Sequence, residues 1–246
     1  MQRLWKISVS VLLLLLMVFV CACVSAEESA LRGYNKKEGY VYLHMGQIEQ
    51  TAEGEIQPII WRVLSVENDQ AYICSEYILG NGRIHPDDKE WIAFKADFSK
   101  TELWDFLNND FANRCFTEEE LSLIADYEHL GKFYLLTGED LNNKAIGFGS
   151  DKARKAWGTE YAKANGLFIY RVKHGKCSPY WTMTQSTAAP YGARCTKAKG
   201  NVGYIRVVVM NEGWRPVCRL DMTKLEVIGG AGTLEEPFKI AGRKAE

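Results

Sequence analysis

The chain has 246 residues, 47% of them hydrophobic, and its 30 basic and 31 acidic residues give a formal net charge of −1. This balance excludes the broad basic surface that attracts nucleic acid, so no nucleic-acid partner is expected. About 220 residues remain after a removable N-terminal segment, which suffices for one domain with a sizeable core and is short for two.

The N-terminal segment has the pattern of an export signal. Arg3 and Lys6 come before an apolar run over residues 11–20, and the small residue Ala22 precedes Cys23. A basic start, an apolar core and a small residue before the cut are typical of a secretory signal, and a cysteine directly after the cut is acylated in lipoproteins. We therefore expect a lipoprotein with Cys23 lipidated, held on the extracytoplasmic face of the cell membrane.

Two alternatives stay open at this end. The small residues up to Ala26 also suit ordinary signal peptidase, which would release a secreted protein. The apolar residues 11–24 could instead remain as an uncleaved anchor, although they are short for ~30 Å of hydrocarbon. Under the lipoprotein hypothesis, residues 1–22 are the signal peptide, 23–38 a polar tether, and 39–240 a single globular domain.

The pattern after the tether predicts strands. Residues 40–43, 56–66 and 71–78 are rich in β-branched and aromatic side chains, and the polar residues 67–70 form a turn signal. A hairpin or meander is therefore expected here. Residues 80–90 contain glycine, proline and aspartate, which predict a loop.

Short helices are predicted in the middle of the chain. Ser99 can cap a segment in which apolar residues recur at helical spacing around residues 103–107. Thr117 and Glu120 have the spacing of a capping box, and residues 152–164 form another helical stretch. Strands are predicted over residues 133–136, 180–184, 202–210, 217–220 and 223–228. The pattern indicates an α+β domain in which strands outweigh helices.

Several segments occur together in the order of one known family. They are PIIWRVL at 58–64, LWDFLNNDF at 103–111, FYLLT at 133–137, YW at 180–181 and GWRP at 213–216. From residue 39 to residue 220 the chain resembles the bacterial family of domains of unknown function numbered 6273, found in surface proteins and lipoproteins. The resemblance implies a C-type-lectin-like mixed domain of short strands with two or three short helices, similar to sulfatase-modifying factors. Residues 182–185 depart from the family's Leu-Arg-Ser-Pro, so a site built on that arginine would be absent.

The lectin-like resemblance suggests a ligand site made of aromatic side chains and a few polar groups. Its candidates are Trp181, Tyr191, Arg194 and Trp214. Exposed aromatic rings could stack on a sugar while polar groups fix its orientation. The alternative interpretation is that the two tryptophans pack in the core, where large aromatic side chains are common.

Five cysteines follow the lipidation site, which is an odd number for an exported protein. Cys177, Cys195 and Cys218 fall in the same third of the chain, so a disulfide between two of them is expected in an oxidising compartment. Cys74 and Cys115 are expected as small buried apolar side chains.

The remaining motifs predict no cofactor and no metal. His174 and Cys177 would supply only half of a zinc site, and four oxygen-bearing residues are too scattered to predict a calcium site: Asn201, Asn211, Glu212 and Asp221. The glutamates at 118–120 fit helix capping better than the paired carboxylates of a hydrolase. Arg215 is expected to hold backbone carbonyls where a strand begins.

The sequence therefore predicts no reaction. We expect a membrane-anchored domain that binds a cell-surface glycan, peptide or protein without catalysis. Two alternatives remain: an enzyme or sulfatase-modifying-like factor on the same fold, and a structural envelope protein.

Overall fold

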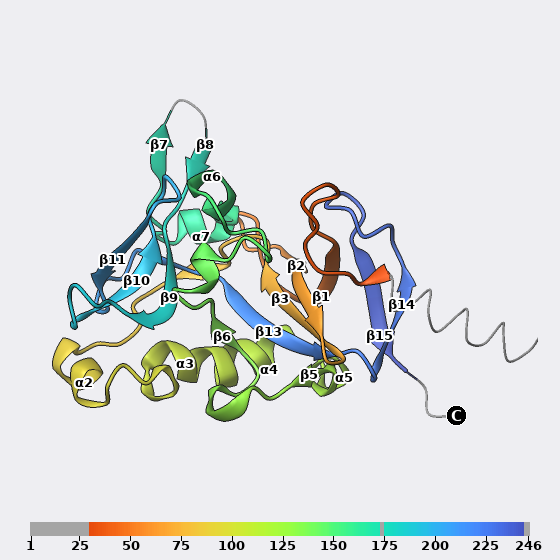
Figure 1. The fold of residues 1–246 in the computed structure, drawn as a ribbon, viewed down its shortest axis with the longest axis horizontal. Coiled ribbons are helices and arrows are strands. Elements are labelled where there is room, and N and C mark those ends of the chain that lie inside the picture. Colours follow the sequence, from red (N-terminus) through yellow and green to blue (C-terminus); the bar gives the residue numbers. More distant parts are fainter. Residues whose placement is uncertain (1–29, 173–174, 244–246) are drawn as a thin grey trace, which may run out of the picture.

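The computed structural model describes residues 30–172 and 175–243 (Figure 1). The expected signal peptide and the lipidation site Cys23 lie outside the described residues. Within them, Leu31 is fully buried, and the Tyr34 amide donates to the Leu64 carbonyl at 3.0 Å. This part of the expected tether therefore packs on the domain. Among the described residues, no helix has the length and apolar character needed to span a membrane.

The larger sheet has eight strands and is built around a hairpin that the sequence predicts. Strands β2 (Ile56–Glu67) and β3 (Gln70–Ser75) are joined at Asn68 and Asp69, whose φ angles are 51° and 57°. Asparagine and aspartate tolerate this left-handed backbone and favour tight hairpin turns. The sheet order is β14 (Leu225–Gly229), β15 (Phe238–Gly242), β1 (Tyr42–Glu49), β2, β3, β13 (Pro216–Asp221) and β5 (Ile124–Ala125), with β6 (Tyr134–Leu135) also paired to β13.

The smaller sheet has five strands. Its order is β11 (Val202–Arg206), β10 (Gly192–Thr196), β9 (Tyr180–Gln185), β12 (Gly213–Trp214) and β4 (Gly80–Asn81). A separate hairpin of β7 (Tyr170–Val172) and β8 (Gly175–Cys177) projects from the top of the molecule in Figure 1. Residue 215 alone separates β12 from β13, so this short segment connects the two sheets.

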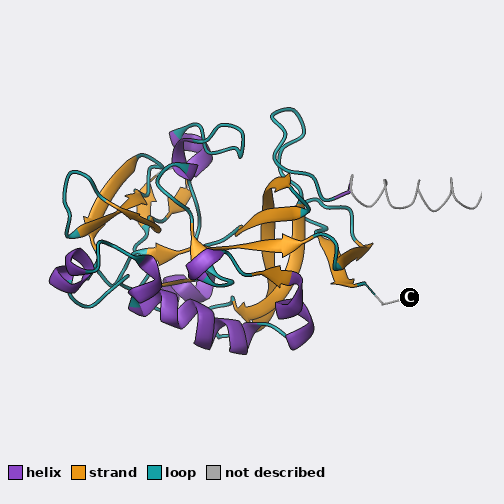
Figure 2. Cartoon of the chain, turned by 60° about the horizontal axis from the view of Figure 1, so that its bottom comes forward, coloured by secondary structure: helices purple, strands orange, loops and turns teal. Residues whose placement is uncertain are grey.

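Short helices gather on one side of the strands, along the bottom of Figure 1, and Figure 2 shows them from that side. They are α2 (Asp88–Ala93), α3 (Glu102–Phe106), α4 (Ala112–Cys115) and α5 (Glu118–Leu123), and a π-helical turn over Leu107–Phe111 makes α3 and α4 continuous. The predicted helix over 152–164 is instead two helices, α6 (Asp151–Arg154) and α7 (Glu160–Ala164). It divides because Thr159 caps α7 by accepting a hydrogen bond from the Ala162 amide at 3.1 Å.

The capping box that the sequence predicts is confirmed, and it also joins α5 to the large sheet. Thr117 accepts from the Glu120 amide at 3.2 Å, while Glu120 accepts from the Thr117 amide at 2.9 Å. The other oxygen of Glu120 accepts from the Gly46 amide at 2.7 Å, where β1 has an irregular register. Gly46 has φ 67°, and a Cβ there would lie 2.4 Å from the Phe116 ring, so only glycine fits.

The core contains both aromatic rings and buried charge. Trp61 is fully buried, and its indole donates to the Met45 carbonyl at 2.8 Å. Arg62 pairs with Glu76 inside the protein, with 2.6 Å between Nε and Oε2. Arg215, also buried, donates from Nε and Nη2 to the Ser75 carbonyl at 3.1 and 2.6 Å. The structural role predicted for Arg215 is thus confirmed, although it holds one carbonyl through two nitrogens. These features establish a mixed α+β domain dominated by sheets.

Candidate functional site

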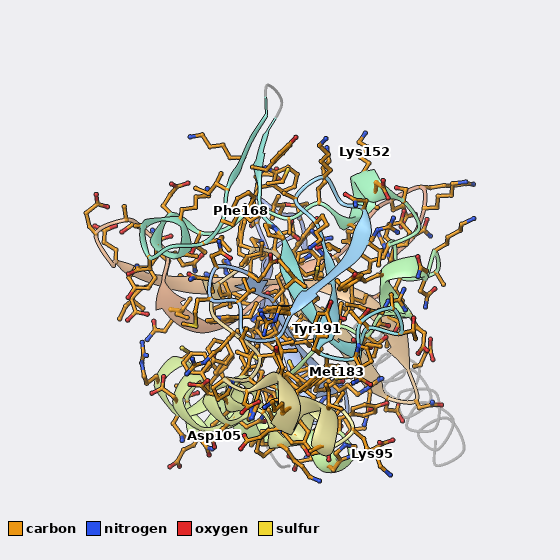
Figure 3. The ribbon with its side chains drawn as sticks, turned by 90° about the vertical axis from the view of Figure 1, so that its left-hand side faces the viewer. Lys95, Asp105, Lys152, Phe168, Met183 and Tyr191 are labelled. Atoms are coloured by element: carbon orange, nitrogen blue, oxygen red, sulfur yellow. The ribbon has the colours of Figure 1, made fainter. Side chains whose placement is uncertain are left out.

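The four predicted ligand-binding residues do not share one cleft. Trp181 is fully buried, and its indole donates to the Gly82 carbonyl at 2.7 Å, so its role is packing. Tyr191 is 42% exposed on the face seen in Figure 3. Arg194 lies against Gly138, where an added Cβ would be 2.7 Å from its Nη1. Trp214 lines a cleft.

That cleft, here called the Trp214 cleft, has a volume of about 370 Å³ and an apolar floor. Trp214 is 6% exposed, and its ring meets Phe106 edge-on with 5.5 Å between the ring centroids. Ring contacts of this geometry hold both side chains in defined positions. The residues lining it are Ile48, Glu49, Leu79, Gly80, Asn81, Gly82, Arg83, Glu102, Leu103, Phe106, Arg114, Tyr161, Ala162, Asn165, Met210 and Trp214. The volume lies within the range of small-ligand sites.

One wall of the cleft is the edge of the smaller sheet. Strand β4 ends the strand order and pairs with β12, so its other side faces no strand of that sheet. Gly80 lies so close to Trp214 that an added Cβ would be 2.5 Å from the indole Cζ2. Gly82 has open space where a Cβ would stand. The two glycines carry no side chain of their own, so the backbone of this edge lies close to the aromatic floor.

Two arginine–glutamate pairs stand on the rim. Arg83 donates to both carboxylate oxygens of Glu102, at 2.7 and 3.3 Å. Arg114 donates to Glu49 at 3.0 Å. The hydrogen bond from Arg83 lowers the pKa of Glu102, so this carboxylate stays ionised at neutral pH. Because the pairs are exposed to solvent, each adds little to the stability of the fold, and their groups remain available to a ligand.

None of the five cysteines in the described residues offers a reactive or bridged thiol. All are buried and unpaired, so the structure does not contain the disulfide expected among Cys177, Cys195 and Cys218. These three residues lie on β8, β10 and β13, which are not neighbours in any sheet. Burial raises the pKa of Cys115 and Cys195 to about 12. The prediction that Cys74 and Cys115 are small buried side chains is confirmed.

Metal-ligating side chains do not cluster in the described part of the chain. No group of three or more His, Cys, Asp or Glu side chains is placed there to hold an ion. His174, half of the zinc pattern weighed from the sequence, lies outside the described residues. Of the four residues weighed for calcium, Asn201, Asn211 and Glu212 line one pocket in the fold, whereas Asp221 lies at the end of β13 and does not line it. That pocket is distinct from the Trp214 cleft.

The signal that sequence reasoning missed is the pair of glycines that flank Asn81. Glycine in a loop is common, and only the neighbouring β12 strand makes Gly80 part of a sheet edge. Comparison with known proteins adds nothing further, because no family model, curated protein or solved structure matches this chain.

Proposed function

We propose that this chain is a membrane-anchored extracytoplasmic lipoprotein whose domain binds an extended peptide segment in the Trp214 cleft, without catalysis. The anchor rests on the basic, apolar and small-residue pattern that ends at Cys23. The motifs from residue 58 to residue 216 support kinship with family 6273 and a C-type-lectin-like variant of the α+β fold. The peptide ligand rests on the geometry of the cleft.

The observation that carries the proposal is a half-buried strand edge that pairs with no further strand of its sheet and lies beside an apolar floor. A peptide can add to the edge of a sheet through its backbone while one side chain enters a pocket. Residues Gly80–Asn81 form that edge, and Trp214 with Phe106 forms the floor. The two ion pairs on the rim offer positive guanidinium groups and negative carboxylates. These groups can bind the amide groups and the charged termini of a peptide.

A glycan fits the cleft less well. Sugars stack on the exposed faces of aromatic rings, whereas Trp214 is 6% exposed and Trp181 is fully buried. A peptide side chain needs no exposed ring face and can pack on the apolar floor of the cleft, which includes Leu103 and Phe106. The balanced rim, with two arginines and two glutamates, favours neither an acidic nor a basic polymer.

The cleft offers a matched pair of variants to test the proposal. Gly82→Val would place a side chain in open space at the mouth of the cleft, so it should block a peptide without a clash in the fold. Gly229→Val adds the same side chain in equally open space at the end of β14. Random heptapeptides would be panned against the full-length protein, and the selected peptides titrated by calorimetry. We expect Gly82→Val to weaken binding at least about tenfold and Gly229→Val to leave it unchanged.

Equal affinity in the two variants, or no selected peptide at all, would refute the peptide site.

The anchor is tested separately with Cys23→Ala. This variant should leave the membrane fraction or keep its leader uncut, and unchanged membrane retention with unchanged mass would contradict lipidation.

An enzyme on the same fold is the second candidate, and one observation favours it. Glu212 lines its own pocket, and burial raises the pKa of its carboxyl to about 7, which suits proton transfer at neutral pH. Incubation with envelope extract, followed by mass spectrometry, would identify products that appear with the native chain and disappear with Glu212→Gln. A purely structural envelope protein would show neither peptide binding nor turnover.

A further inference from the structure

A second pocket, of about 520 Å³, lies beside the hairpin formed by β10 and β11. Its other side is formed by residues close to β7 and β12. Its walls combine aromatic and aliphatic side chains with amines, amides and one carboxyl. They are Phe168, Tyr170, Pro179, Lys197, Ala198, Lys199, Asn201, Ile205, Asn211 and Glu212. None of these residues lines the Trp214 cleft.

Glu212 is the unusual member of this pocket. Its side chain is 4% exposed, and its Oε2 is buried without a hydrogen-bond partner in the described part of the chain. Its backbone is fixed, because the Glu212 carbonyl accepts from the Gly82 amide at 3.0 Å. Buried polar atoms in proteins nearly always have partners, so a carboxyl left in this state at a pocket wall indicates a ligand group.

The charges around Glu212 indicate whether the ligand group is an anion or a cation. Lys197, from the residue after β10, lies close enough to stabilise the carboxylate, and Lys199 brings a second ammonium to the same pocket. The other titratable group facing Glu212 is the buried thiol of Cys195 on β10. Burial disfavours the charged form of Glu212, so the lysines give the pocket a positive balance.

The other side chains that line this pocket favour a ligand that contains a ring. Phe168 is 44% exposed, which leaves part of its ring free at the surface (Figure 3). Lys199 holds its Nζ 5.3 Å from the centroid of Tyr170 and so lies along the aromatic wall. Lys197 donates to the Tyr204 carbonyl at 2.9 Å, and an ammonium group has two further hydrogens for a ligand.

We propose that this pocket binds a small ring-bearing carboxylate, whose acid group lies between Lys197 and Lys199 and accepts a hydrogen bond from the carboxyl of Glu212 while its ring packs on Phe168. An ammonium ligand would meet two like charges, and a neutral ligand would leave both lysines without a counter-charge. A sugar acid and an aromatic acid share this chemistry. The proposal does not depend on peptide binding in the Trp214 cleft, because the two sites have no lining residue in common.

The test uses two acids and their neutral amides, titrated into the full-length protein and followed by calorimetry. The pairs are glucuronate with glucuronamide and 4-hydroxybenzoate with 4-hydroxybenzamide, which differ mainly in charge. We expect at least one acid to bind about tenfold more tightly than its amide. The acid that binds more tightly identifies the sugar or the aromatic source.

Charge variants make the test specific to this pocket. Lys199→Ala should weaken binding of the acid about tenfold. Lys95→Ala serves as the control, because Lys95 is an exposed lysine after α2 that Figure 3 places far from Phe168. In the native chain, binding should weaken as pH rises from 6 to 8, because ionised Glu212 repels an acid, whereas Glu212→Gln should remove this dependence.

Three results would overturn the proposal. The first is equal binding of acid and amide, or no saturable binding of either acid. The second is an equal loss of affinity in Lys199→Ala and Lys95→Ala. The third is an unchanged pH dependence in Glu212→Gln, provided that its circular dichroism matches the native chain.

Discussion

The buried carboxyl of Glu212 should make the stability of the whole domain depend on pH. Burial raises its pKa from 4.5 to about 7 in the folded chain, while the unfolded chain keeps the lower value. Between these two pH values the folded chain retains a proton that the unfolded chain has released. Stability therefore falls as pH rises through this window, and Glu212→Gln, which cannot ionise, should be spared the loss.

The magnitude follows from the two pKa values. A difference of one pKa unit corresponds to about 1.4 kcal/mol, so the rise from 4.5 to about 7 amounts to roughly 3 kcal/mol at and above pH 8. The same relation gives about 2 kcal/mol at pH 6 and about 1 kcal/mol at pH 5. Well below pH 4.5 the effect vanishes, because both states then hold the proton.

Urea denaturation at pH 4, 5, 6, 7 and 8 measures this dependence. The free energy of unfolding of the native chain is subtracted from that of Glu212→Gln at each pH, so contributions from histidines and other carboxylates cancel. We expect the difference to increase with pH by roughly 3 kcal/mol in total. Glu53→Gln, at an exposed glutamate in the turn before β2, is the control and should give a flat difference. A flat difference for Glu212→Gln as well would refute the burial argument.

Other parts of the structure support three further predictions. Glu76→Leu leaves the charge of Arg62 buried and unpaired, so it should cost about 3–5 kcal/mol in urea denaturation, while the apolar double variant with Arg62→Met should recover most of the loss. A cost below about 1 kcal/mol would show that the pair is not desolvated. Thr117→Ala removes the cap of α5 and should cost about 1 kcal/mol, seen as a thermal midpoint about 2–4 °C lower. The five cysteines after residue 30 should resist a thiol reagent in the folded chain and all react in urea, whereas three reactive thiols would prove one disulfide.

The parts of the fold that could be predicted from the sequence are those set by local chemistry. The β2–β3 hairpin follows from two long β-rich runs and a polar turn, and Thr117 with Glu120 makes a cap that needs no distant partner. Strand β15 could not be predicted, because it follows a glycine-rich turn and pairs in parallel with β1 from almost 200 residues away. Strand β10 was missed as well, since its residues include glycine, alanine and cysteine rather than a clear alternation.

The sites were harder to predict than the strands because each is assembled from distant segments. Trp214 could be recognised as a candidate, but its cleft needs the glycines around Asn81 and the helix that contains Phe106. Glu212 was weighed only as a calcium ligand, because its burial next to Lys197 depends on the pairing of β10 with β11. For Trp181 the alternative interpretation, packing in the core, is confirmed, because this strand tryptophan is fully buried and its indole nitrogen has a backbone partner.

One short segment explains why the two sites have fixed geometry. Met210 and Trp214 line the cleft, whereas Glu212, between them in sequence, lines the other pocket. This segment cannot shift freely, because β12 is paired within the small sheet, and Arg215 is tied to the carbonyl of Ser75 at the end of β3 in the large sheet. Side chains held in this way lose little conformational freedom when a ligand binds, so small sites can still bind usefully. The junction between the two sheets is therefore the part of this domain where we place its function.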